Sequence, residues 1–481
     1  MPLDRRSFLV RTGAVGAATL ATGPFAGLAA RSASAAEGTA DAGLRHDPSY
    51  GPLGPVPDLR DGVVRLHLPE GFRYRSFDPV GSTLTDGTPV PPNHDGMAAF
   101  PGPRGNVVLV RNHEINGPGT AFGDVSRAYD PAARGGTTTV VVSRRGHVRR
   151  SWVSCNGTQM NCSGGPMPWG SWITCEETVN GPDVGPDFTG VSNAALRQKH
   201  GYIYEVPAYG RRSRGPVRAA GRFAHESVAF SPNDGWLYMT EDNFGFPSGF
   251  YRYKPPVSPF RAGRLLDGGR LQMLAVRGEP NADLSVGQPM GVRYRVSWID
   301  IDEPDPDFAP GTTNNDAISA VGAQGRAEGA ALFSRLEGMI YDRGVAYFTS
   351  TQGGRPDPTA PLPSGFGDGR GQVWGYDTRR GILRLVYESP SLEVLDLPDN
   401  VTASPRGTLV LCEDGGGVNY LRGLTQDGRI FDFALNAIPG QESDEFAGST
   451  FAPGGGTLYV NIQSRNAMSF AIWGPWWRGG F

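Results

Sequence analysis

Twelve acidic residues stand beside short apolar runs that read as strands, at six separate places in the chain. Carboxylates gathered in a partly buried space repel one another and are costly to desolvate unless cations compensate. Their hard oxygens suit calcium, magnesium or manganese. The pattern therefore predicts metal binding by Asp95, Glu114, Glu176, Glu177, Glu226, Glu241, Asp242, Glu337, Asp399, Glu413, Asp414 and Glu445.

One thiol stands among these acids, since Cys175 directly precedes Glu176 and Glu177. A thiolate ligand brings in a softer ion such as iron or zinc. Cys155 and Cys162 are close enough in sequence to form a disulfide in an oxidising compartment. By strand alternation, His113 and His225 should point away from the neighbouring acids and support them rather than bind metal.

The elements that position these acids are six similar hairpins. Each begins with a polar residue, runs a short strand, turns at Gly or Pro and continues as an apolar strand; the copies span 94–114, 161–178, 226–243, 337–354, 399–416 and 445–463. Six such hairpins, with room for further strands between them, predict an all-β six-bladed propeller whose inner strands bring the acids to a central metal-lined channel. The 69 glycines and 41 prolines fit many short strands joined by turns. Residues 277–325 read as an insertion, and the best candidate for a helical stripe is 327–336.

The first residues read as an export signal. Arg5 and Arg6 precede Ser-Phe-Leu, a run rich in Ala and Gly, and a small-residue cleavage site near Ala35. Paired arginines predict recognition by the Tat export machinery, so residues 1–35 are expected to be a signal peptide and 36–481 a single propeller domain. We expect a secreted protein without a stable membrane anchor, most simply a monomer, whose metal is loaded before export. The net charge of −3 argues against nucleic acid as a partner.

Several short motifs occur in a fixed order: RNHE from Arg111, NCSGG from Asn161, PWGSWITCEE ending at Glu177, GRFAHE ending at Glu226, TED ending at Asp242, RLEG from Arg335 and CEDG from Cys412. Together with the Tat-type signal, they resemble the PhoX-type alkaline phosphatase family over nearly the whole chain. The resemblance implies a secreted phosphatase that hydrolyses small phosphorylated substrates with an iron (Fe³⁺) and calcium (Ca²⁺) cluster and a metal-bridging oxygen.

The resemblance also implies roles for individual residues. Iron would be bound by Cys175, Glu226 and Glu337, and calcium by Glu114, Glu176, Glu241 and Glu413. Arg335 would contact the phosphate, as a planar fork of donors can, and Asn112 is a weaker candidate for that task.

Two departures from the family pattern bear on the cluster: Ser227 follows Glu226 where Gly is common, and the fourth hairpin ends in Thr351 and Gln352 instead of an acidic pair. Two other functions stay open. One is a calcium-dependent propeller hydrolase, a lactonase or a phosphotriesterase-like enzyme, with fewer carboxylates and no thiolate. The other is a non-catalytic secreted propeller stapled by metals.

Overall fold

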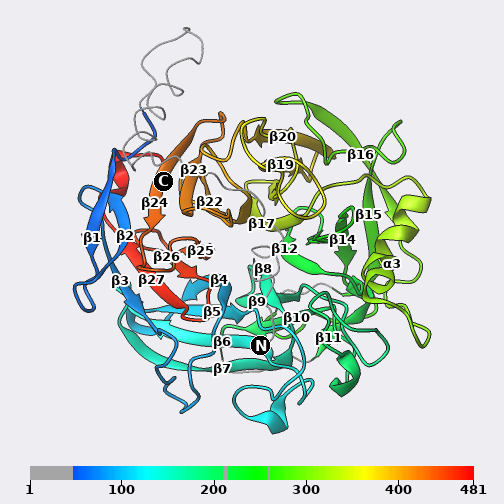
Figure 1. Cartoon of the computed structure of the whole chain (residues 1–481), viewed down its shortest axis with the longest axis horizontal. Coiled ribbons are helices and arrows are strands. Elements are labelled where there is room, and N and C mark those ends of the chain that lie inside the picture. The colour runs from blue at the N-terminus through cyan, green and yellow to red at the C-terminus, as the bar shows by residue number, and fades with distance from the viewer. Residues whose placement is uncertain (1–46, 210–214, 258–260) are drawn as a thin grey trace.

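The computed structural model describes residues 47–209, 215–257 and 261–481 and is built almost entirely of antiparallel strands, with 43% of residues in strands and 7% in helices. Figure 1 shows these strands arranged in a circle around a centre. The expectation of an all-β propeller-like fold is thus confirmed. The expected signal at 1–35 lies outside the described residues.

All six predicted hairpins are present. Their strands are β4 (His94–Pro101) and β5 (Val107–His113), β8 (Asn161–Met167) and β9 (Ser171–Glu176), β12 (His225–Phe230) and β13 (Leu237–Glu241), β17 (Leu336–Asp342) and β18 (Val345–Ser350), β21 (Pro398–Ala403) and β22 (Leu409–Glu413), and β25 (Phe446–Phe451) and β26 (Leu458–Ile462). The first strand of each hairpin packs beside the first strand of the next, and β25 packs beside β4, so these strands close a ring (Figure 1).

Outer strands extend each hairpin by antiparallel pairing. They are β6 (Gly135–Val142) and β7 (Val148–Thr158), β10 (Ile203–Pro207) and β11 (Pro216–Val217), β14 (Phe250–Lys254) and β15 (Arg270–Val276), β19 (Gln372–Asp377) and β20 (Ile382–Glu388), and β23 (Tyr420–Leu424) and β24 (Ile430–Asn436). The sixth hairpin is extended by β27 (Met468–Trp473) and by β3 (Arg73–Phe77) from the other end of the chain.

Within the described residues these strands form five sheets, because β16 (Arg293–Asp300) pairs with both β15 and β20 and joins two hairpin units into one nine-stranded sheet. The expectation of six blades therefore stays a prediction.

The N-terminal strands close the circle. Besides β3, strands β1 (Leu53–Pro57) and β2 (Val64–Pro69) extend the fifth unit through β24. Beneath this closure lies an aromatic cluster in which the Phe72 ring centroid is 5.1 Å from that of Phe433 and 4.8 Å from that of Trp476. Both ends of the described chain thus contribute to one core.

The predicted insertion, 277–325, contains β16 and most of helix α3 (Asn314–Ala327), which ends two residues beyond it. The helix begins at a Thr313 cap that accepts a hydrogen bond from the Asp316 N–H. The expected helical stripe at 327–336 is wrong: the helix ends at Ala327, and Leu336 begins β17. Five short 3₁₀ turns complete the described elements: η1 (Pro103–Gly105), η2 (Val125–Arg127), η3 (Asn193–Ala195), η4 (Arg218–Ala220) and η5 (Trp476–Arg478). In the described part of the chain, no helix has both the length and the apolar character that crossing a membrane requires.

A β-bulge recurs at the start of every hairpin. In the first hairpin, for example, His94 pairs with His113, and the register then shifts before Met97. The same shift occurs in the next four hairpins, and in the sixth it falls one residue later, after Ala447. Because a bulge bends its strand and re-aims side chains, this repeated irregularity sets which residues reach the centre.

Candidate metal centre

Two positions in each hairpin lie at the centre of the ring. In the first strand, the position is one residue after the residue that opens the pairing, as Asp95 follows His94. In the second strand, it is one residue after the last paired residue, as Glu114 follows His113. The first position holds Asp95, Cys162, Glu226, Glu337, Asp399 and Ala447. The second holds Glu114, Glu177, Asp242, Thr351, Asp414 and Gln463. We call the acidic members of both positions, with Glu445, the carboxylate ring.

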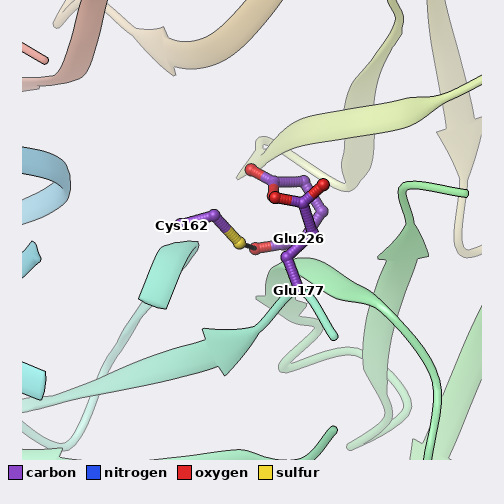
Figure 2. A group of neighbouring side chains, drawn as sticks. All are labelled: Cys162, Glu177 and Glu226. Atoms are coloured by element: carbon purple, nitrogen blue, oxygen red, sulfur yellow. Dashed lines mark hydrogen bonds between the residues drawn. The ribbon is translucent and has the colours of Figure 1, made fainter. Parts of the chain in front are cut away.

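Cys162 is the thiol at this ring. Its sulfur and carboxylate oxygens of Glu177 and Glu226 lie within 4.8 Å of one another, and all three residues are buried. Figure 2 shows the three side chains converging from different parts of the chain. One sulfur and two oxygens at this spacing could hold a single metal ion.

Two further groups continue this arrangement. Glu226, Glu337 and Asp399 form one, and Asp399, Asp414 and Glu445 form the other, with ligand oxygens again within 4.8 Å in each group. Glu226 and Asp399 belong to two groups each. The three groups are therefore linked, as neighbouring sites that share bridging carboxylates would be.

The electrostatics of the ring call for cations. Burial, followed by the neighbouring Glu337 and Asp399, raises the pKa of Glu226 well above its usual value. Burial and Asp414 raise the pKa of Asp399 to about 7. One oxygen of Glu226, Oε2, is buried and has no hydrogen-bond partner among the described residues. Because opposite charge nearby favours ionised carboxylates, bound metal ions would lower these pKa values and occupy the unpaired oxygen.

The donor set also fits metal in kind. A thiol with carboxylates suits iron or zinc, whereas groups of oxygens alone suit calcium or magnesium. The residues present thus fit a mixed centre, with a softer ion at Cys162 and harder ions at the groups built only of carboxylates.

Arg335 brings positive charge to this ring. Its Nε and Nη2 donate to both oxygens of Asp242 at 3.1 and 2.9 Å, and Nη2 also donates to Glu337 at 2.6 Å. The guanidinium carbon lies 5.2 Å from the centre of the Phe244 ring. A fixed, buried guanidinium beside the proposed metal ligands is well placed to receive an anion.

Glu114 also belongs to the ring, and a neighbouring amide donates to its carboxylate. Nε2 of Gln463 donates to Glu114 at 2.8 Å and to Asp95 at 2.6 Å. Gln463 occupies the position that is acidic in four of the other hairpins. Glu114 therefore lies beside the three ligand groups rather than inside any of them.

Three of the predicted calcium ligands point elsewhere. Glu176, Glu241 and Glu413 are the last paired residues of β9, β13 and β22, so alternation directs them away from the centre. Each accepts a backbone N–H at or just before the start of the third strand of its own unit: from Gly201 at 2.9 Å, from Gly249 at 2.8 Å and from Tyr420 at 3.0 Å, respectively. The structure does not bring these three together.

Asn112 and Cys175 occupy one equivalent position, two residues before Glu114 and Glu177. There Asn112 donates to the carbonyls of Cys162 and Ser163 and accepts from Trp172 and Thr174. Thr240, at the same position of the third hairpin, donates to the Glu337 carbonyl at 2.7 Å. This position joins neighbouring hairpins, and the wholly buried Cys175 lies in an apolar cluster there.

The expected Cys155–Cys162 disulfide is wrong. All four cysteines are free in the structure, and the thiol of Cys162 donates to the His225 carbonyl at 3.3 Å. His113 and His225 support the hairpins, as expected: His113 contacts the Pro92 carbonyl and Thr138, and His225 contacts the Gly221 carbonyl.

The two departures from the family pattern have structural explanations. Ser227 is fully buried, and its hydroxyl lies 3.1 Å from that of Ser163, the residue at the same position of the second hairpin. Thr351 takes the ring position in the fourth hairpin and donates to the Pro398 carbonyl at 2.7 Å, while Gln352 donates to the Ser364 carbonyl. The fourth hairpin thus contributes Glu337 alone to the carboxylate ring.

Sequence reasoning did not single out Cys162 as a candidate ligand, and it assigned no ion to Glu177, Asp399, Asp414 or Glu445. A signal for Cys162 was present, because it stands one residue after Asn161 just as Asp95 stands after His94 and Glu226 after His225. The bulge that directs this position inward is visible only in the structure.

A linked set of buried and half-buried carboxylates and one thiol at the centre of a circular β-fold defines a candidate metal centre in a propeller-like protein. The family model for alkaline phosphatase PhoX matches residues 49–465. This chain therefore belongs to the PhoX alkaline phosphatase family, and the expected enzyme class, a phosphoric monoester hydrolase, is confirmed.

One solved structure supports the fold. The Pseudomonas fluorescens PhoX structure in complex with vanadate, a transition state analogue, is 19% identical, with a TM-score of 0.62 over 90% of this chain and 98% of that chain. A gluconolactonase from Xanthomonas campestris gives a TM-score of 0.39 at 13% identity, over 90% of this chain and 99% of that one. A search of curated proteins found no match.

Proposed function

We propose that this protein is a secreted, metal-dependent alkaline phosphatase that hydrolyses small phosphomonoesters at an iron and calcium centre in the carboxylate ring. The observation that carries the proposal is the chain of three linked ligand groups, one of them containing Cys162, in a member of the PhoX family. Export through the Tat pathway is part of the proposal and rests on the Arg5–Arg6 motif.

Each ion is assigned by the donors that surround it. Iron would be held by Cys162, Glu177 and Glu226, where the thiol lies. Calcium would be held by the oxygen groups around Glu337 and Asp399, with Glu114 at the border of the ring. Cys175, Glu176, Glu241 and Glu413 would instead hold the hairpins in place.

The metal ions would supply the positive charge that a phosphomonoester dianion needs in an acidic channel. The chain itself supplies Arg335, whose guanidinium can donate to a phosphoryl oxygen. Asp242 and Glu337 accept from Nε and Nη2 and so orient the guanidinium before substrate arrives, and we assign Nη1 to the phosphoryl group. A donor fixed in this way stabilises the charge that develops on the transferred group.

In this proposal, substrate would approach the carboxylate ring from the end where the first strands begin. Deeper along these strands, Met97, Ser163, Met339, Val401 and Ser449 line a cavity of only about 30 Å³, room for about one water molecule. This cavity is too small to admit a phosphomonoester.

The decisive experiment measures metal content and hydrolysis of p-nitrophenyl phosphate at alkaline pH on protein purified after export. We expect iron and calcium in the parent, and loss of iron and activity in Cys162→Ser. The matched control is Cys175→Ser, which removes an equally buried thiol outside the ligand groups and should keep both. Glu337→Gln, with Glu241→Gln as its control, tests the oxygen groups.

Three outcomes would overturn parts of this proposal. A fully metallated parent that leaves the substrate intact would refute the phosphatase. Calcium without iron would refute the mixed centre. Iron lost from Cys175→Ser and kept in Cys162→Ser would return the ligand role to Cys175.

A further inference from the structure

A second cavity opens beside the carboxylate ring, with a volume of about 440 Å³. Small-molecule sites in proteins fall in the range of about 300–1,000 Å³ and are mostly apolar. This cavity has that character, since Val90, Pro91, Pro92, Ile115 and Phe122 line it, with Arg134 as its basic residue.

The cavity wall continues directly into the ring. Ile115 is bonded to Glu114, and Pro92 stands three residues before Asp95. The two segments are locked together, because Glu114 N–H donates to the Asn93 carbonyl at 3.0 Å and the Asn93 amide donates back to the Glu114 carbonyl at 2.7 Å. The same two stretches of chain therefore form the side of the ring and the wall of the cavity.

Two further contacts make that wall rigid. His113 contacts the Pro92 carbonyl at 3.0 Å, and its ring packs edge-on against Phe122 at 5.7 Å between centroids. Arg134 donates to the carbonyls of Asn116 and Gly117, so its guanidinium is tied to the loop that follows Ile115. A rigid apolar wall loses little entropy when a ligand binds it.

We propose that this cavity holds the alcohol-derived part of the substrate, and that the enzyme prefers phosphomonoesters whose alcohol carries an aromatic ring or an apolar group of similar size. The proposal rests on the proposed phosphatase function. Hydrolysis breaks the bond between phosphorus and the alcohol oxygen, water supplies the new oxygen on phosphorus, and the alcohol leaves with a proton. With the phosphoryl group at the ring and Arg335, the remainder of the substrate must lie outside the ring, and the cavity adjoins it.

The lining favours an apolar occupant over a second anion. Its basic residue, Arg134, already donates to the Asn116 and Gly117 carbonyls, whereas an aromatic ring would bury against proline, valine, isoleucine and phenylalanine side chains. Burying an apolar ring releases free energy in proportion to the area removed from water. A methyl or ethyl ester would leave most of this surface unfilled.

The test compares benzyl phosphate with ethyl phosphate on the metal-loaded enzyme. Thr120 is exposed and lines the cavity, so Thr120→Trp should fill it without disturbing the fold. We expect the ratio of kcat/KM for benzyl over ethyl phosphate to fall about tenfold in this variant, with ethyl phosphate hydrolysed as in the parent. Comparing one ratio between proteins cancels the different intrinsic reactivities of the two esters.

The matched control is Val125→Trp, an exposed position in the same loop that does not line the cavity; its ratio should equal that of the parent. Thr88 also lines the cavity, so Thr88→Trp repeats the test independently and replaces Thr120→Trp if that variant does not fold. An unchanged ratio in the folded filled variant, or an equal fall in the control, overturns the proposal.

A binding measurement separates this proposal from the phosphatase itself. Titration of 2-naphthol, followed by its fluorescence, reports on the cavity whether or not the protein hydrolyses esters. Tighter binding to the parent than to Thr120→Trp supports the cavity site, and equal affinity overturns it. A parent that binds 2-naphthol yet hydrolyses neither ester would refute the proposed function and leave the cavity site standing.

Discussion

Arg335 has a backbone φ of +39°, in the left-handed region that a bulky residue rarely adopts. Asn93, Met160 and Leu397 adopt the same region directly before the first strands of their hairpins. The turn into the hairpin thus fixes the backbone from which the Arg335 side chain extends, and the hydrogen bonds to Asp242 fix the position of its guanidinium. A side chain restrained at both ends is suited to orient substrate.

Replacing Arg335 by lysine should separate orientation from charge. Lysine keeps the positive charge and must adopt the same left-handed backbone conformation, but it lacks the planar guanidinium. We therefore expect kcat/KM for p-nitrophenyl phosphate to fall about 10²-fold, the cost typical of removing one stabilising donor. Metal content should change little, whereas the unfolding free energy should fall, because lysine cannot reproduce the three hydrogen bonds to Asp242 and Glu337. Arg370→Lys, at another buried arginine bound to an aspartate, is the control and should retain activity. Loss of metal from Arg335→Lys would instead assign Arg335 to the assembly of the centre.

Asn112 should behave in the opposite way. Its amide makes four hydrogen bonds between the first and second hairpins, and each buried group left unpaired costs about 1–3 kcal/mol. Asn112→Ala is therefore expected to lower the unfolding free energy by about 3 kcal/mol, measured in urea, while the folded variant keeps its metal and its kcat. A stable variant without activity would restore Asn112 to the role that the sequence suggested.

At the residue level, many of the acidic residues of the candidate site could be predicted, but the direction in which each side chain points could not. Glu226 and Glu337 were predicted as ligands and lie in the linked groups, because acids at strand starts are visible in the sequence. The choice between Cys162 and Cys175 depends on alternation and on the bulge at the start of each hairpin. A shift of one residue exchanges the two faces of a strand, and the amino-acid sequence alone does not show where a bulge occurs.

At the scale of elements, the hairpins were predictable and their connections were not. Alternating apolar runs with Gly and Pro turns located all six hairpins. Helix α3 was missed because glycines and polar residues dilute its apolar face, and only Ala317, Val321, Gly322 and Gly325 are buried. The bridging of two sheets by β16 depends on contacts between segments far apart in the sequence.

The connection between β9 and β10 carries a buried histidine that should make stability depend on pH. His200 Nδ1 lies 2.6 Å from Glu176, and Nε2 lies 3.5 Å from Asp130. Although burial opposes it, the charge of Glu176 and the contact with Asp130 raise the pKa of His200 to about 9. Because this value is above the usual 6.5, the ion pair stabilises the fold fully below about pH 6.5 and loses that contribution as the pH rises through about 9.

His200→Gln should reduce this pH dependence. We expect the parent to lose on the order of 2 kcal/mol more stability than the variant between pH 6.5 and pH 9.5, measured by urea unfolding at each pH. Other groups that titrate in this range, such as Glu241 and Glu413 with pKa values near 7, contribute equally to both proteins and cancel. His147→Gln, at an exposed histidine, should match the parent. Parallel curves for parent and His200→Gln would show that His200 is not charged in the fold.

At the scale of the whole molecule, the ring depends on its closure. The first described strands pair with the last, as β3 does with β27 and β2 with β24, and the aromatic cluster around Phe72 packs beneath both pairs. The three ligand groups of the carboxylate ring draw on the second to sixth hairpins, and Asp95 and Glu114 of the first hairpin complete the ring. A gap at the closure would let the mutually repelling acids move apart, so closure and metal binding should support each other.

Phe72→Ala tests that closure. Phe72 is 3% exposed and packs on Tyr50, Phe433 and Trp476, and removing a buried phenylalanine costs about 3–5 kcal/mol. We expect the unfolding free energy of the metal-loaded protein to fall by that amount. The unfolding curves followed by tryptophan fluorescence and by circular dichroism should coincide, because the ring opens as one unit. Leu362→Ala, at a residue 61% exposed, should leave stability unchanged. Fluorescence that changes well before circular dichroism would show instead that the closure opens locally while the ring, and with it the metal centre, stays intact.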